Sequence, residues 1–160
     1  MLLVGDVRVV RDDLPAAFKY VRERMRSADF ILGNLEGSIS DSGAMWPKGG
    51  VGGSWKSDAR QMAAIESAGF NAMNVANNHA TDFGYEALAE SMRHLDRLGA
   101  AHTGGGRTFC EAHAPAIAER KGCRVAWVIP RSIYAAGTWG RNRQAWPCCA
   151  AAPPMNRHRL

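Results

Sequence analysis

The sequence predicts an α/β protein with a mostly parallel sheet, flanking helices and a terminal hairpin. Three apolar runs that end in polar residues alternate with three segments of helical periodicity, and this alternation is typical of parallel sheets. A later apolar stretch contains a Lys121-Gly122 turn, which predicts two antiparallel strands. The length of 160 residues suits one domain with its own core.

Each of the three predicted strands breaks at polar residues. The run LLVGDV places the first strand near Leu2–Val7. We expect the second strand near Phe30–Asn34, in DFILGNLEG, and the third near Met73–Ala76, in NAMNVANNH. Right-handed crossovers would make these strands parallel neighbours, with their carboxyl ends on one edge of the sheet.

Start and stop signals predict three helices between these strands. The segment DDLPAAFKYVRERMRSA opens with aspartates and a proline, and its apolar residues recur at helical spacing. The second helix lies in SDARQMAAIESAGF, where Ser57 or Asp58 is the expected cap and Gly69 ends the helix. The third lies in GYEALAESMRHLDRLGA, and we interpret Asp82 as its cap.

Composition excludes several classes of protein. The apolar fraction of 46% and the charged fraction of 22% are those of a soluble globular protein. No apolar run is long enough to cross a bilayer, and MLLVGDV reaches an acid too early for a signal peptide. We therefore expect a cytoplasmic chain as given, or a membrane-associated or exported one if an upstream signal is missing. The four cysteines lack metal-binding spacing.

The net charge of +5 does not indicate a nucleic-acid partner. Residues 132–160 contain four arginines and no acid, and without these four the chain has 16 basic and 15 acidic residues. The body of the protein is thus nearly neutral and offers no strong phosphate-binding face. We expect no nucleic-acid binding.

The three strand ends carry side chains of one chemical kind. Asp6 follows the first strand, Asn34 and Glu36 follow the second, and Asn78 and His79 follow the third. In open α/β sheets, ligands bind at the carboxyl ends of the strands. Carboxylates, amide oxygens and an imidazole together suit Mn²⁺, Fe, Zn²⁺ or Mg²⁺, and such a site can hydrolyse phosphate esters. The alternative is that the aspartate and asparagine only cap turns.

A glycine-rich segment, SDSGAMWPKGGVGGSWKSD, is long for a bare connection and predicts a functional loop. We expect the loop around Trp46, Lys48 and Trp55 to roof the site. Lys48 is predicted to contact an anionic substrate, although a lysine in such a loop is more often only solvated.

Four motifs occur in order along the chain: GDV, GNLEG, ANNHATDFG and a GGG loop before a Glu-Ala pair. From about Leu2 to Val128 the sequence thereby resembles the bacterial capsule-synthesis family of the CapA type, linked to poly-γ-glutamate biosynthesis. That family is a branch of the calcineurin-like metallophosphoesterases. The resemblance implies the first half of an αββα sandwich, a divalent metal cofactor of one or two ions, and an anionic small-molecule or polymeric substrate.

The resemblance also implies a role for each matching residue. Four residues are implied or contributing metal ligands: Asp6, Glu36, Asn78 and Asn34. His79 would stabilise the charge of the transition state or protonate the leaving group. Asn77 and Lys48 are predicted to bind substrate.

Two departures lower the expected activity: the first is from the superfamily and is normal for the capsule branch, and the second is from the family itself. Arg8 stands where the superfamily has a histidine two residues after the first aspartate. Histidine motifs of the H-W-G and G-H-x-H type, which the family's second half supplies, are absent from this sequence. We therefore expect a truncated protein with weak metal affinity and hydrolysis near background. A non-catalytic remnant or ligand-binding fragment is the alternative, and the exposed half-sheet is expected to self-associate.

Residues 132–160 are predicted to form an atypical basic tail after a domain that spans residues 1–131. Under one choice of codons, QAWPCC shifted by one base reads Pro-Gly-Leu-Ala-Val-Leu, which resembles the family. We therefore expect that this tail is frame-shifted or disordered, with the slip between Val128 and Gln144.

Overall fold

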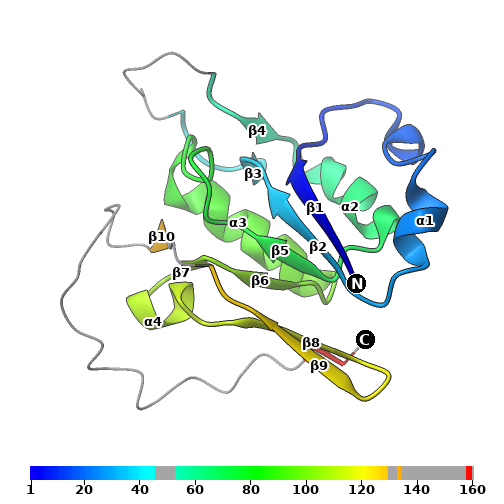
Figure 1. The fold of residues 1–160 in the computed structure, drawn as a ribbon. Coiled ribbons are helices and arrows are strands. Elements are labelled where there is room, and N and C mark those ends of the chain that lie inside the picture. The colour runs from blue at the N-terminus through cyan, green and yellow to red at the C-terminus, as the bar shows by residue number, and fades with distance from the viewer. Residues whose placement is uncertain (46–52, 130–132, 135–157, 160) are drawn as a thin grey trace.

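The centre of the molecule is a four-stranded parallel sheet (Figure 1). The computed structural model describes residues 1–45, 53–129, 133–134 and 158–159. The sheet has the order β1-β2-β5-β6, and every neighbouring pair is parallel. The four strands are β1 (Leu2–Val7), β2 (Ile31–Leu35), β5 (Ala72–Asn74) and β6 (Ala101–Thr103).

The three predicted strands are present, adjacent and parallel, so this part of the fold prediction is confirmed. The third strand is shorter than predicted and ends at Asn74, whose side-chain oxygen accepts from the backbone nitrogen of Ala76 at 2.9 Å. β6 was not predicted. It follows the third predicted helix. Its residues Ala101, His102 and Thr103 pair with β5 at the edge of the sheet.

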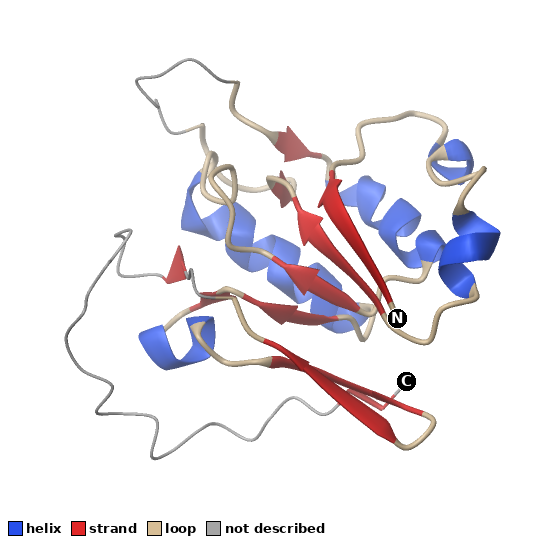
Figure 2. Ribbon diagram, in the orientation of Figure 1, coloured by secondary structure: helices blue, strands red, loops and turns tan. Residues whose placement is uncertain are grey.

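Helices cover one face of the sheet (Figure 2). The helix α2 (Met62–Ala68) ends at Gly69 in the left-handed conformation with φ of 80°, as predicted. The helix α3 (Gly84–Arg97) buries Leu88 and Leu95 completely. Together with strand residues such as Ile31 and Met73, these side chains form the larger of the two apolar cores found among the described residues.

A β-hairpin covers part of the other face. The strands β8 (Ala116–Arg120) and β9 (Cys123–Trp127) are antiparallel, as predicted. Lys121 and Gly122 join them with φ of 51° and 74°, the positive values that a tight hairpin turn requires. Trp127 packs edge-on against Phe30 at 6.0 Å between ring centroids and forms the second core there.

The helix predicted between the first two strands is wrong in its extent. The structure has a short 3-10 turn, η1 (Leu14–Ala16), and a five-residue helix, α1 (Arg22–Arg26). Asp13 caps only the 3-10 turn. Tyr20 is 93% exposed and Val21 49% exposed, so the middle of the segment buries too little apolar surface to hold a continuous helix.

The remaining elements are short. They are β3 (Ser38–Ile39) paired with β4 (Lys56–Ser57), η2 (Ala59–Gln61), β7 (Gly105–Gly106) paired with β10 (Ile133–Tyr134), α4 (Phe109–Ala112), and β11 (His158–Arg159) paired with β8. Most of the predicted tail lies outside the described residues. The predicted division at residue 131 therefore stays a prediction.

β1 lies at an edge of the sheet and leaves Leu3 60% exposed. Self-association through this edge stays a prediction. Among the helices in the described residues, α3 is the longest with 14 residues, and none is both long and apolar enough to cross a membrane.

Candidate functional site

Sheet register aligns a row of polar residues across the four parallel strands. Asp6 of β1 pairs with Asn34 of β2, Asn34 with Asn74 of β5, and Asn74 with Thr103 of β6. Residues paired in a parallel sheet have side chains on the same face. The row therefore places a carboxylate and two amides side by side near the carboxyl ends of the strands, as the sequence predicted for Asp6 and Asn34.

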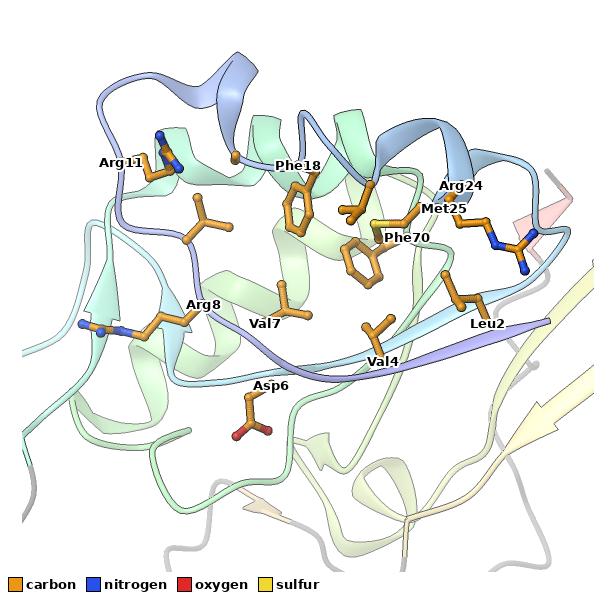
Figure 3. A pocket seen from close by; sticks show the side chains of 13 residues that line it. Leu2, Val4, Asp6, Val7, Arg8, Arg11, Phe18, Arg24, Met25 and Phe70 are labelled. Carbon is orange, nitrogen blue, oxygen red and sulfur yellow. The ribbon is translucent and has the colours of Figure 1, made fainter.

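An irregularity in β1 directs Asp6 to that face. Between Leu3 and Asp6, β1 has one more residue than the matching part of β2. Strict alternation would have pointed Asp6 the same way as Val4, and one extra residue reverses every later side chain. Figure 3 shows the result: Val4 and Val7 point into an apolar cavity of about 420 Å³ beside α1, whereas Asp6 points away on the other side of the strand.

Asn34 lies at the centre of the cluster and uses both ends of its amide. Its Nδ2 donates to Asp6 Oδ1 at 2.7 Å and to Glu36 Oε2 at 2.6 Å. Its Oδ1 accepts from the amide nitrogens of Asn74 at 2.7 Å and Asn77 at 3.2 Å. A flipped amide would set oxygen against two carboxylates and NH₂ against two NH₂ groups. The four bonds therefore fix the nitrogen of Asn34, not its oxygen, toward the carboxylates.

Glu36 is 8% exposed and lies just after β2, where the chain turns at Gly37. Gly37 has φ of 84°, and a Cβ there would lie 2.6 Å from the carbonyl oxygen of Trp55. Only glycine allows both the left-handed conformation and this close approach. The second glycine of GNLEG thus brings the segment at Trp55 against the end of β2.

Asn77 is buried and fully engaged within the site. Besides Asn34 Oδ1, its Nδ2 donates to the carbonyl of Leu35 at 2.7 Å. Its Oδ1 accepts from the backbone nitrogens of Gly37 at 3.4 Å and His79 at 3.1 Å. These bonds join the ends of β2 and β5 and set the backbone at His79. Through these hydrogen bonds, Asn77 holds the Asn34 side chain and the backbone of His79 in place.

His79 lies between two carboxylates. Its Nδ1 is 2.7 Å from Asp82 Oδ2, and its Nε2 is 4.0 Å from Glu36 Oε1. The His79 side chain is 13% exposed, so the ring is largely shielded from water. Because Asp82 occupies Nδ1, Nε2 is the ring atom that faces the cluster and can exchange a proton there.

The interpretation of Asp82 as a helix cap is wrong. The residue at the N-cap of α3 is Phe83, which makes no capping hydrogen bond through its side chain. Asp82 is completely buried, and its Oδ2 accepts from the backbone nitrogen of Trp55 at 2.8 Å as well as facing His79. The three-residue spacing from His79 to Asp82 within one turn was the signal that sequence reasoning passed over.

Trp55 covers His79. The two rings are stacked, with centroids 3.8 Å apart and 12° between their planes. The Arg8 guanidinium carbon lies over the Trp55 ring at 4.9 Å from its centroid. Contact of Trp55 with the site agrees with the predicted roof, while Trp46 and Lys48 lie outside the described residues.

The structure thus brings together Asp6, Asn34, Glu36, Asn77 and His79. Asn78, the predicted amide ligand, is exposed. Sequence reasoning missed the participation of Asn74, although an asparagine inside an apolar strand is unusual and could have marked it.

The donor chemistry of the cluster fits a divalent cation in part. Asp6 and Glu36 offer oxygens held by one amide nitrogen, and His79 adds a nitrogen beside Glu36. Hard cations prefer such oxygen-rich sets. Within the described residues, however, no three histidine, cysteine, aspartate or glutamate side chains stand together closely enough to hold a metal. A cation would have to displace the Asn34 amide from between the carboxylates.

Fold and site together define a parallel α/β protein with a polar cluster at the carboxyl ends of its strands. Comparison with known protein families then identifies the family within this class. The family described as bacterial capsule synthesis protein PGA_cap matches residues 2–157, so the chain belongs to that family.

The chain is also similar to individual proteins. The chain is 33% identical over 132 residues to each of two uncharacterized proteins of Sinorhizobium fredii, y4sH and y4uA, and the match covers 79% of this chain and 29% of each relative. It is 23% identical over 153 residues to capsule biosynthesis protein CapA of Bacillus anthracis, which covers 90% of this chain and 37% of that protein. The chain thus spans about a third of the length of these relatives.

Proposed function

We propose that this chain supplies part of a metal-dependent, phosphoesterase-like hydrolase site that acts on an anionic substrate in capsule synthesis. One observation carries the proposal: Asp6 and Glu36, from two strand ends, converge on a single amide nitrogen, with His79 Nε2 4.0 Å from Glu36. The name of the Bacillus anthracis relative, a capsule biosynthesis protein, supports the biological role.

Asp6 and Glu36 would hold the cation, and Asn34 and Asn78 are the further ligands that the family resemblance implies. The cofactor would be Mn²⁺, Fe, Zn²⁺ or Mg²⁺, and such an ion supplies Lewis-acid activation of a phosphoester or acyl group. These few ligands predict weak binding by this chain.

The chain's own contribution to chemistry would come from His79. Asp82 accepts from Nδ1–H and so fixes the ring orientation and leaves Nε2 directed to the cluster. At that position Nε2 can donate a proton to a leaving oxygen or a hydrogen bond to developing negative charge. The Trp55 ring, stacked on the imidazole, excludes water from one side.

A second candidate is a non-catalytic module that binds a cation or an anionic ligand without turnover. Two observations favour it: the described residues contain no group of three ionisable ligands ready to hold a metal, and Asn78 is exposed. Both candidates share the Asp6 and Glu36 carboxylates and differ in whether His79 performs chemistry.

Calorimetry with Mn²⁺ tests the shared part. Asp6→Ala should abolish Mn²⁺ binding, whereas Asp58→Ala, at an exposed carboxylate away from the cluster, should leave it unchanged. Equal Mn²⁺ binding by wild type and Asp6→Ala would show that Asp6 serves only as a hydrogen-bond acceptor. Hydrolysis of bis(p-nitrophenyl) phosphate by wild type and its loss in His79→Ala select the hydrolase. Mn²⁺ binding without turnover selects the non-catalytic module.

A further inference from the structure

Arg8, Trp55 and His79 form a continuous stack beside the carboxylate cluster. The ring centroids of Trp55 and His79 lie 3.8 Å apart, and the Arg8 guanidinium carbon lies 4.9 Å from the Trp55 ring centroid. Arg8 is the residue after β1 and one of the residues that line the apolar cavity, and Figure 3 shows its guanidinium directed away from Phe18. The stack therefore connects an exposed cation to the histidine of the proposed site.

Within the described part of the chain, the Arg8 guanidinium contacts the Trp55 ring and not a carboxylate. Arg8 is exposed, and none of the carboxylates of the described residues forms an ion pair with it. A guanidinium that stacks on an aromatic face keeps its N–H edge free, and that edge matches carboxylate and phosphate groups with two parallel hydrogen bonds. Trp55 thus restrains the arginine without consuming its donors.

The surrounding charge explains why a fixed cation would matter here. Asp6, Glu36 and Asp82 place three carboxylates within the cluster, and together they repel an anion that approaches His79. Arg8 is separated from His79 only by the Trp55 ring, and its positive charge is therefore positioned to offset that repulsion.

We infer that Arg8, held by Trp55, is the anion-binding residue of this site and takes a phosphate or carboxylate group of the substrate. The inference rests on the proposed function in placing the reaction at His79. Binding of the anion itself needs only the guanidinium edge and does not require metal.

The test is calorimetric titration of the whole chain, in EDTA, with inorganic phosphate and separately with glutarate. Arg8→Met removes the charge and should weaken binding by about tenfold or more, the effect of losing charge-assisted hydrogen bonds. Arg8→Lys keeps the charge without the planar fork and should bind less tightly than wild type but more tightly than Arg8→Met. Arg11→Met is the matched control, because Arg11 is an exposed arginine three residues on and should leave affinity unchanged.

Loss confined to phosphate or to glutarate identifies which group Arg8 receives, and loss of both shows that it accepts either. Wild-type affinity in Arg8→Met, an equal loss in Arg11→Met, or no binding by wild type in the millimolar range would overturn the inference. Thermal unfolding of each variant identifies any that misfold. If Arg8→Met misfolds, the affinity of Arg8→Lys tests the inference instead, and wild-type affinity in Arg8→Lys would then overturn it.

The outcomes also separate this inference from the proposed function. Phosphate binding that depends on Arg8, in a chain that neither binds Mn²⁺ nor hydrolyses esters, sustains the anion site and rejects the hydrolase. Mn²⁺ binding together with ester hydrolysis, and no effect of Arg8→Met on phosphate affinity, sustains the hydrolase and rejects the anion site.

Discussion

The buried carboxylate of Asp82 gives the sharpest test of how the site is held together. Its Oδ2 accepts from Trp55 N at 2.8 Å and lies 2.7 Å from His79 Nδ1, and the residue is completely buried. A hydrogen bond to a charged group contributes about 1.5–3 kcal/mol net, and a buried donor left without an acceptor costs about 1–3 kcal/mol. Asp82→Asn keeps the volume and one acceptor oxygen, so it should destabilise the fold by about 1.5–3 kcal/mol.

Asp82→Ala leaves both donors without an acceptor and should cost about 3–5 kcal/mol. That is a large share of the stability of a small domain, typically about 5–15 kcal/mol. Guanidinium unfolding followed by circular dichroism measures both variants. Asp58→Asn is the control, because that aspartate is exposed and makes no capping hydrogen bond. Its effect should stay within about 0.5 kcal/mol.

A double-mutant cycle isolates the contact with the histidine. Asp82→Asn combined with His79→Ala should show a coupling of about 1 kcal/mol or more, as residues within one hydrogen-bond network do. A cost below about 0.5 kcal/mol for Asp82→Asn, together with no coupling, would refute the conclusion that Asp82 positions His79.

Three further perturbations follow from other contacts. Hydrogen bonds from Ser42 and Ser40 lower the pKa of Glu90 from 4.5 to about 2, so its contribution is present above about pH 4.5 and is lost as the pH falls toward 2. Glu90→Gln should therefore cost about 1 kcal/mol at pH 7 and progressively less in urea unfolding as the pH falls from about 4.5 through 2, and a pH-independent difference would contradict this. Gly104→Ala should cost at least about 2 kcal/mol by thermal unfolding, because φ is 96° and the new Cβ would lie 2.6 Å from that of Ala76. Asn34→Asp places a further carboxylate directly between those of Asp6 and Glu36 and should cost about 2–3 kcal/mol in EDTA, with Mn²⁺ restoring more stability than it adds to wild type. An unchanged melting temperature of this variant in EDTA would contradict the central role of the Asn34 amide.

The sequence alone determined the elements whose signals are local. The hairpin turn at Lys121-Gly122, the end of α2 at Gly69 and the long amphipathic helix α3 all follow from nearest neighbours along the chain, because backbone conformation and helical periodicity are local properties. The helix prediction for the segment around α1 was wrong because it too used only local signals. Its apolar spacing is helical, but Tyr20 stays exposed instead of packing into the core, and packing is a tertiary property.

The convergence of Asp6, Glu36 and His79 was also predictable, since carboxyl ends of adjacent parallel strands meet at one edge of a sheet. The direction in which each side chain points at that edge was not predictable from the sequence. It depends on one extra residue in β1, which turns Asp6 toward Asn34, and on pairing across strands distant in sequence. Tertiary structure alone decided that the Asn34 nitrogen faces the carboxylates, because its orientation is fixed by four partners from three separate segments.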